Sequence, residues 1–175
     1  MKIFQPTYEE YPDSPYFSRY INTVTDEDAL NALRNQYKNI LAMYDNLPEK
    51  IQNYAYAPNK WTVKELLGHM VDAERVFSYR AMCIARGEQQ LLPGFDENSY
   101  MEFAHFSNRS LESILQEYKN LREANLALFE SLTPAMLSKK GSANGNSVSV
   151  RALIWILAGH EQHHIHILQE RYLSS

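Results

Sequence analysis

The chain has 175 residues, 45% of them hydrophobic and 22% charged, which is the composition of one globular domain spanning residues 1–175. The net charge of −4 and the lack of a Lys/Arg block argue against nucleic acid or an anionic membrane as a partner. Cys83 is the single cysteine, which excludes an internal disulfide. No stretch is apolar enough to span a bilayer or to act as a secretion signal, so we expect a cytoplasmic protein.

Residues 1–24 are rich in tyrosine, phenylalanine and proline, which predicts an irregular arm whose aromatic rings pack on the body of the protein. Apolar residues at helical spacing then predict helices over residues 27–46, 62–86, 110–132 and 148–173. We expect loops at 87–109 and 138–147 and no β-strand, and the first loop is long enough to pack over part of the body. The pattern predicts an all-α four-helix bundle and leaves the helix order open.

Four of the six histidines lie close together in the last predicted helix, within the sequence Gly159-His-Glu-Gln-His-His-Ile-His166. At 100° per residue, His160 and His164 lie one turn apart on the same side, where both rings can reach one metal ion. His163 lies to the other side of His160 and is a weaker candidate, and His166 points away. A histidine-rich face exposed to solvent is the alternative interpretation.

Two histidines bind a metal weakly, so a third ligand is expected from a facing helix. His69 is the only histidine of the second predicted helix, and it lies in the apolar segment 66–71, where a buried neutral ring needs a partner. Gly68 and Gly159 directly precede two of the candidate ligands, and we expect them to let the two helices approach closely. The predicted metal ligands are His69, His160 and His164.

The segment His160-Glu-Gln-His-His164 also matches H-E-x-x-H, the zinc-protease motif in which the glutamate is the general base. That interpretation requires a third ligand downstream, but Ile167 and Glu170 stand where metzincins have glycine and histidine. We therefore set the protease aside. Glu161 is a candidate for a catalytic base or for a residue that orients a metal ligand. The alternative is that its side chain is exposed to solvent.

Two further residues of the second predicted helix are candidates for the site. Asp72 lies three residues after His69 and either orients a ligand, accepts a proton, or is a solvated charge. Arg80 returns to nearly the same side about 16 Å along the helix axis, where it is a candidate to bind an anionic group of a cofactor or substrate at the pocket mouth. Cys83 is about 21 Å along the axis by the same rise, too far to share the metal.

Several motifs together resemble the DinB-like (DinB/YfiT) metalloprotein superfamily, in particular its DinB_2 branch. The segments that carry the resemblance are Asn59–Glu65, Leu67–Arg75, Arg80–Gly87, Gly94–Asp96 and Val150–His164. The resemblance covers nearly the whole chain from the aromatic arm onward. It implies a four-helix bundle that holds one divalent metal ion with three histidines, which correspond here to His69, His160 and His164.

Several members of this family resemble thiol-dependent transferases or isomerases that use bacillithiol, mycothiol or glutathione, and others are described as metal-dependent hydrolases. The resemblance therefore implies a metal-dependent enzyme acting on a small molecule, with a low-molecular-weight thiol as a second cofactor in the transferase case. A hydrolase and a non-catalytic metal-binding bundle are the alternatives. Three nitrogen ligands suit zinc, nickel, iron or cobalt. The many tyrosines of the arm and the first helix further predict a homodimer.

Overall fold

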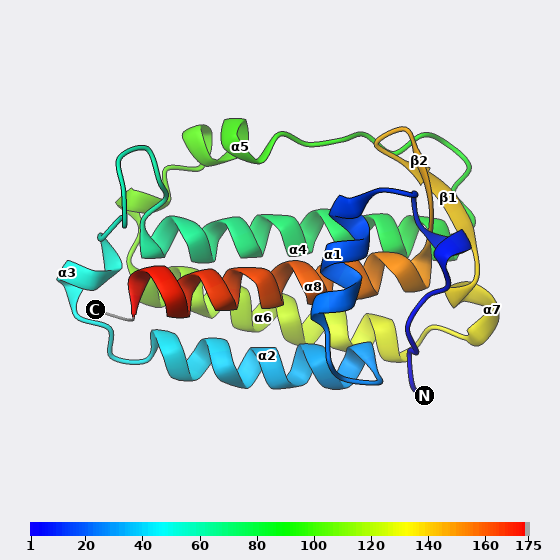
Figure 1. The fold of residues 1–175 in the computed structure, drawn as a ribbon, viewed down its shortest axis with the longest axis horizontal. Helices are drawn as coiled ribbons and strands as arrows, with labels where there is room; N and C mark the ends of the chain where they lie inside the picture. Colours follow the sequence, from blue (N-terminus) through cyan, green and yellow to red (C-terminus); the bar gives the residue numbers. More distant parts are fainter. Residues whose placement is uncertain (174–175) are drawn as a thin grey trace.

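Four long helices form the body of the molecule in the computed structural model, which describes residues 1–173 (Figure 1). They are α2 (Ala29–Tyr44), α4 (Val63–Arg86), α6 (Leu111–Glu130) and α8 (Val150–Ile167). The predicted all-α four-helix bundle is confirmed. The predicted helix ends agree within two residues, except that a π-helical turn (Leu168–Tyr172) follows α8. Within residues 1–173, no helix has the length and apolar character that a membrane span needs.

Contacts between the helices give their order around the bundle. α4 packs against α8 and α6, and α2 packs against the same two helices, so α2 and α4 lie diagonally opposite each other. In Figure 1, α4 and α6 run in the same direction and α8 runs opposite to both. The connection between α4 and α6 must therefore return along the length of the bundle, which explains why it is long.

The N-terminal arm is more regular than predicted. It holds a 3-10 turn (Tyr8–Glu10) and a nine-residue helix, α1 (Pro15–Thr23), which crosses α8 (Figure 1). Ser14 Oγ accepts a hydrogen bond from the amide of Tyr16 at 3.3 Å, and Pro15 is the first helical residue, where its missing N–H is no loss. The prediction of an irregular arm is therefore wrong for α1, because this proline starts a helix instead of preventing one.

The two glycines beside the predicted ligands make room for different segments than expected. A Cβ atom on Gly159 would lie 2.0 Å from the carbonyl oxygen of Tyr20, so this glycine lets α1 lie directly on α8. A Cβ atom on Gly68 would lie 2.4 Å from the ring of Phe106, in the 3-10 turn Phe106–Asn108. The expectation that these glycines bring α4 and α8 together is therefore wrong.

Shorter helices lie in the connections. They are α3 (Glu49–Gln52), α5 (Glu97–Ala104) and α7 (Pro134–Leu137). α5 interrupts the predicted loop 87–109, and Asp96 caps it by accepting hydrogen bonds from the amides of Asn98 and Ser99. Just before α5, Phe95 packs against the apolar core, so this connection covers the body as its length predicts.

A β-hairpin occupies the predicted loop 138–147. Strands β1 (Lys140–Ala143) and β2 (Asn146–Ser149) pair antiparallel. Asn144 and Gly145, which join them, have φ angles of 51° and 74°, the left-handed backbone of a two-residue type I′ turn. The prediction of a chain without strands is therefore wrong.

A layer of buried polar side chains divides the apolar core in two along the bundle. One part includes α8 as far as Ala158, with residues of α1, α2 and the second half of α4. The other includes Ile165 and the following turn, with the first part of α4 and of α6. The buried layer between them contains His69, Glu74, Arg122, His160, Glu161 and His164.

Candidate metal centre

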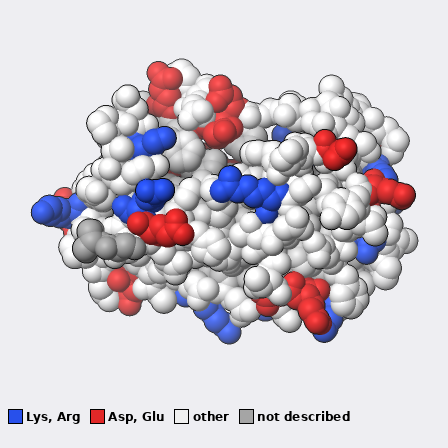
Figure 2. Space-filling view, viewed as in Figure 1, with Lys and Arg blue, Asp and Glu red and all other residues white. Residues whose placement is uncertain are grey.

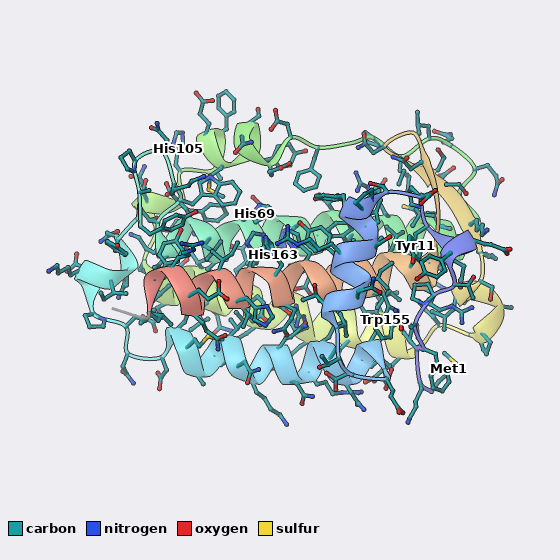
Figure 3. The ribbon with its side chains drawn as sticks, in the orientation of Figure 1. Met1, Tyr11, His69, His105, Trp155 and His163 are labelled. Carbon is teal, nitrogen blue, oxygen red and sulfur yellow. The ribbon has the colours of Figure 1, made fainter. Side chains whose placement is uncertain are left out.

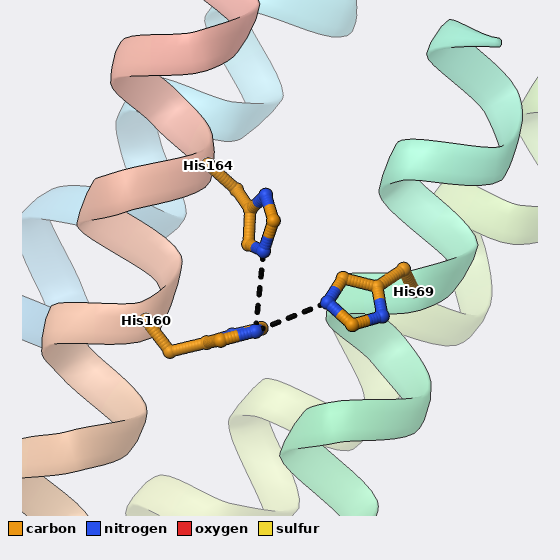
Figure 4. Close-up of side chains that lie close together, drawn as sticks. All are labelled: His69, His160 and His164. Carbon is orange, nitrogen blue, oxygen red and sulfur yellow. Dashed lines mark hydrogen bonds between the residues drawn. The ribbon is translucent and has the colours of Figure 1, made fainter. Parts of the chain in front are cut away.

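Three histidine side chains meet between α4 and α8. His69 comes from α4, and His160 and His164 lie one turn apart on α8 (Figure 4). The Nε2 atom of His160 lies 3.0 Å from Nε2 of His69 and 3.2 Å from Nε2 of His164. Ligand atoms of all three residues lie within 4.8 Å of one another. The structure therefore brings together the three histidines that the sequence predicts as ligands.

This arrangement suits a metal ion better than it suits hydrogen bonding. A neutral imidazole nitrogen carries either one proton or one lone pair, so Nε2 of His160 cannot form good hydrogen bonds with both neighbours. Nitrogen ligands of a tetrahedral metal, 2.0–2.1 Å from it, lie about 3.3 Å from one another, close to the two distances in this structure. The three residues thus fit a divalent metal ion.

Burial keeps the three imidazoles neutral. Loss of solvent lowers the pKa of His69 to about 4 and lowers the pKa of His160 and His164 well below the usual value, and neighbouring histidines add to the effect. Each ring is therefore uncharged at neutral pH and offers a lone pair to a metal. Within residues 1–173, Nδ1 of His164 is buried and has no hydrogen-bond partner. No hydrogen bond at Nδ1 therefore fixes the orientation of this ring.

Aromatic side chains hold the histidine rings in place. The ring centre of Trp61 lies 4.5 Å from that of His69. Tyr20 and Phe77 both pack near His160, with ring centres at 5.5 Å and 5.9 Å from its ring centre. Trp61 directly precedes Thr62, whose side chain accepts a hydrogen bond from the amide of Glu65 in the capping box that starts α4.

The histidines open onto a cavity of about 540 Å³. Its walls come from α1, α4, α8, the hairpin and the segment before α5. The aromatic side chains that line it are Tyr16, Phe17, Tyr20, Trp61, Phe77 and Phe95. The polar side chains that line it, apart from the histidines, are Ser14, Arg80, Glu97, Asn144 and Asn146. A volume of this size holds a small organic molecule.

Arg80 is the predicted binding residue that the structure places in the cavity wall. Its side chain is only 7% exposed, and its Nη2 donates a hydrogen bond to the carbonyl of Pro93 at 2.6 Å. The guanidinium lies 6.0 Å from the ring centre of Phe95. Arg80 thus shares one cavity with the three histidines.

Glu161 belongs to a buried charge network on the other side of α8. Its carboxylate accepts hydrogen bonds from the hydroxyl of Tyr118 at 2.6 Å and from Nη2 of Arg122 at 2.8 Å. Arg122 also donates to both carboxylate oxygens of Glu74, at 2.9 Å and 2.7 Å. The exposed position considered for Glu161 is therefore wrong. Because Glu161 faces α6, it does not line the cavity as a catalytic base would.

Asp72 also lies apart from the cavity. Burial is the main cause that raises its pKa, followed by the charge of Glu117, while Arg75 and Arg109 lower it. Both arginines pair with Glu117, at 2.6 Å and 2.5 Å. Asp72 therefore lies on the side of α4 that faces α6, near a surface cluster of ion pairs. The structure does not bring it together with the histidines.

The other histidines lie outside the cluster. The ring of His163 packs 5.8 Å from that of Tyr20, and exposed His166 accepts a hydrogen bond from the side-chain amide of Gln162. His105 lies near α5, apart from His69 (Figure 3). Among these residues, none shares the point where the three Nε2 atoms meet.

Charged side chains are scattered over the face seen in Figure 2, with acidic ones gathered over α5, the helix that carries Glu97 and Glu102. Glu97 is exposed and stands at the rim of the cavity. The entrance is therefore more acidic than the interior, whose charged side chain is Arg80.

The parts of the site that come from distant segments could not be predicted from the sequence. The aromatic residues of α1 and the asparagines of the hairpin reach the cavity only because these segments fold over α4 and α8. The one local signal was Asn144-Gly145, a pair typical of two-residue hairpin turns.

A family model described as the DinB superfamily, DinB_2, matches residues 32–168. The chain belongs to the DinB superfamily. Among solved structures, this DinB protein is similar to YfiT from Bacillus subtilis, described as a probable metal-dependent hydrolase with an unusual four-helix bundle topology. The two share 16% sequence identity, with a TM-score of 0.74 over 84% of this chain and 87% of YfiT, which supports the fold. No curated protein matches the chain.

Proposed function

We propose that this DinB protein is a metal-dependent transferase that joins a low-molecular-weight thiol to an electrophilic small molecule. The observation that supports it is the convergence of three neutral imidazole nitrogens at the wall of a cavity of about 540 Å³. Three protein ligands leave room for an exogenous ligand, which is the pattern of catalytic and not of structural sites. The ligands in this proposal are His69, His160 and His164, with zinc, nickel or iron as the divalent metal.

The chain's own residues have three tasks in this proposal. The histidines hold the metal, which when bound supplies positive charge that favours a thiolate over a thiol. Tyr20, Trp61 and Phe77 exclude water from the reacting atoms and orient the rings. Glu161 has a structural task, because its bonds to Arg122 and Tyr118 anchor the turn of α8 that carries His160 against α6.

In the transfer step, the thiolate sulfur attacks the electrophilic carbon. A carbon–sulfur bond forms while the bond to the leaving group breaks, and the leaving group departs with the electron pair. The proton of the thiol passes to water. No carboxylate base is needed, which agrees with the positions of Asp72 and Glu161 outside the cavity.

Hydrolysis is the second candidate function, and the description of YfiT favours it. Its difficulty is the general base, because the carboxylate that lines the cavity is Glu97, at the exposed rim. The two functions differ in their need for a thiol. The transferase needs both metal and an added thiol, whereas the hydrolase cleaves an activated ester without thiol.

Metal-loaded protein is assayed with a chloronitrobenzene plus glutathione, bacillithiol or mycothiol, and separately with a nitrophenyl ester. We expect activity in the first assay alone, and we expect it to survive Cys83→Ser because the thiol is external. Ester cleavage without thiol would support the hydrolase instead. Activity in neither assay would favour a non-catalytic metal-binding protein.

We also propose that the protein is a cytoplasmic homodimer. Aromatic side chains remain exposed on the arm, with Tyr8 at 78% and Tyr16 at 55%, and on the α5 side, with Phe103 at 73%. Apolar surface of this kind is often covered by a partner. Light scattering at micromolar concentration measures the mass, and a monomer would contradict the proposal.

A further inference from the structure

Arg80 carries a positive charge in the wall of the cavity, well removed from the three histidines. It lies eleven residues after His69 on α4, so their Cα atoms are about 16 Å apart along the axis and on nearly the same side of the helix. Helical side chains lean toward the N-terminus, which directs the guanidinium back toward the cavity interior.

The charge of Arg80 has no acidic partner within residues 1–173. The other buried arginine, Arg122, binds two carboxylates. Arg80 instead gives one hydrogen bond to the carbonyl of Pro93, and a guanidinium has five N–H donors. A buried cation without a counter-ion is costly, and it is stabilised when an anion binds beside it.

Between Arg80 and the histidines the cavity is apolar. Phe77 lies one turn before Arg80 and contacts His160. Because α8 runs opposite to α4, Ile156 and Leu153 extend from His160 toward the Arg80 end, and both line the same cavity. A molecule that lies along this wall meets nitrogen ligands at one end, hydrocarbon in the middle and a guanidinium at the other end.

We propose that Arg80 forms a carboxylate subsite, so that the substrate is a small acid with an aromatic or aliphatic segment between its carboxylate and its reacting group. This inference rests on the proposed function for the reacting end of the molecule. Asn144 and Asn146, from the hairpin, line the same cavity and carry amide donors that suit a carboxylate. Phe95 beside the guanidinium adds an aromatic surface for the substrate body.

The charges of the cavity favour a carboxylate over a phosphate. A phosphate group carries close to two negative charges at neutral pH, whereas the end of the cavity away from the histidines offers, within residues 1–173, the single guanidinium of Arg80. Glu97 at the rim opposes a second negative charge. The fork of the guanidinium matches the two oxygens of a carboxylate.

The competing explanation is that Arg80 only fixes the segment before α5 through its bond to Pro93. Calorimetry at pH 7.5 with 4-phenylbutyrate and its uncharged amide separates the two. Both are measured on the full chain, once metal-free and once loaded with zinc, because a carboxylate can also bind a metal. The variants are Arg80→Gln, Arg80→Lys and, as a matched control, Arg86→Gln, which changes an exposed arginine of the same helix.

We expect the acid to bind the metal-free protein at least roughly tenfold more tightly than the amide, as a charge-assisted hydrogen bond implies. Arg80→Gln removes this preference, Arg80→Lys keeps part of it and Arg86→Gln keeps all of it. Equal affinity for acid and amide, absence of binding, a preference that survives Arg80→Gln, or a preference that requires zinc would each overturn the proposal.

If Arg80→Gln does not fold, the NMR signal of the Arg80 Nε–H group in the unmodified chain decides. Movement on adding the acid but not the amide supports the subsite, and no movement overturns it. Neither measurement needs turnover. A protein that binds the acid through Arg80 but catalyses neither reaction would therefore disprove the proposed function and leave the subsite standing.

Discussion

Arg122→Met tests how the buried polar layer is held together. Arg122 is 1% exposed, and it donates hydrogen bonds to Glu74, to Glu161 and to the carbonyl of Leu33 at distances of 2.7–2.9 Å. Methionine has a similar length but no charge, so the variant leaves two buried carboxylates without their cation. Removing one partner of a buried ion pair costs about 3–5 kcal/mol in the free energy of unfolding.

For a chain of this size, 1 kcal/mol shifts the melting temperature by roughly 2–4 °C, so we expect Arg122→Met to melt about 6–20 °C lower. Circular dichroism during heating and during urea titration measures the loss. Arg34→Met is the matched control, because its ion pair with Glu130 is 42% and 47% exposed and contributes less than about 1 kcal/mol. Equal losses in the two variants would refute the argument that burial makes the Arg122 network important.

Three further predictions concern the metal centre and its cover. Replacing any one of His69, His160 and His164 by alanine should abolish stoichiometric metal in elemental analysis, whereas His166→Ala should retain it; full metal content in the His69 variant would rule out a site shared by two helices. Relative to protein in metal at a hundred times its Kd, protein treated with a chelator should melt roughly 5–10 °C lower and remain helical. Complete unfolding on chelation would mean that the metal is structural. Gly159→Ala should displace α1, because its Cβ meets backbone, and should cost about 1–3 kcal/mol in a urea titration; an unchanged midpoint would contradict the close packing.

The meeting of the three histidines could be predicted from the sequence because much of their geometry is local. Helical spacing alone places His160 and His164 on one side of α8, and the apolar neighbours of His69 indicate that its ring is buried. The bundle follows from four apolar stripes for the same reason. These inferences depend only on distances within one helix and on the need to bury apolar side chains.

The role of a neighbouring carboxylate could not be predicted, because it depends on which helix covers each face. Glu161 directly follows His160, yet it points at Arg122 on α6. Asp72 is about 60° around the axis from His69, far enough to face α6 as well. A sequence gives the angle between two side chains around the axis of α4 or α8. The order of the helices around the bundle decides which neighbouring helix each side chain faces.

The short elements escaped prediction because their residues favour two conformations. Pro15 ends a helix when it stands inside one and favours a helix when it stands first, and only the Ser14 cap distinguishes the cases. The segment around Asn144-Gly145 is too short for an alternating pattern to stand out, although its turn residues are typical of a hairpin. Both elements form walls of the cavity, so the shape of the site was less predictable than the meeting of its three histidines.

The placement of the histidines also bears on the proposal that the metal is catalytic and not structural. An apolar core lies on each side of the polar layer, and the Arg122 network ties α4, α6 and α8 together within that layer. The bundle therefore has two cores and an ion network that hold α4 against α8 without help from a metal. A metal that is not needed for the fold is free to keep an open position toward the cavity. The chelation and Arg122→Met experiments together test this argument, since it requires the network variant to lose more stability than the metal-free protein.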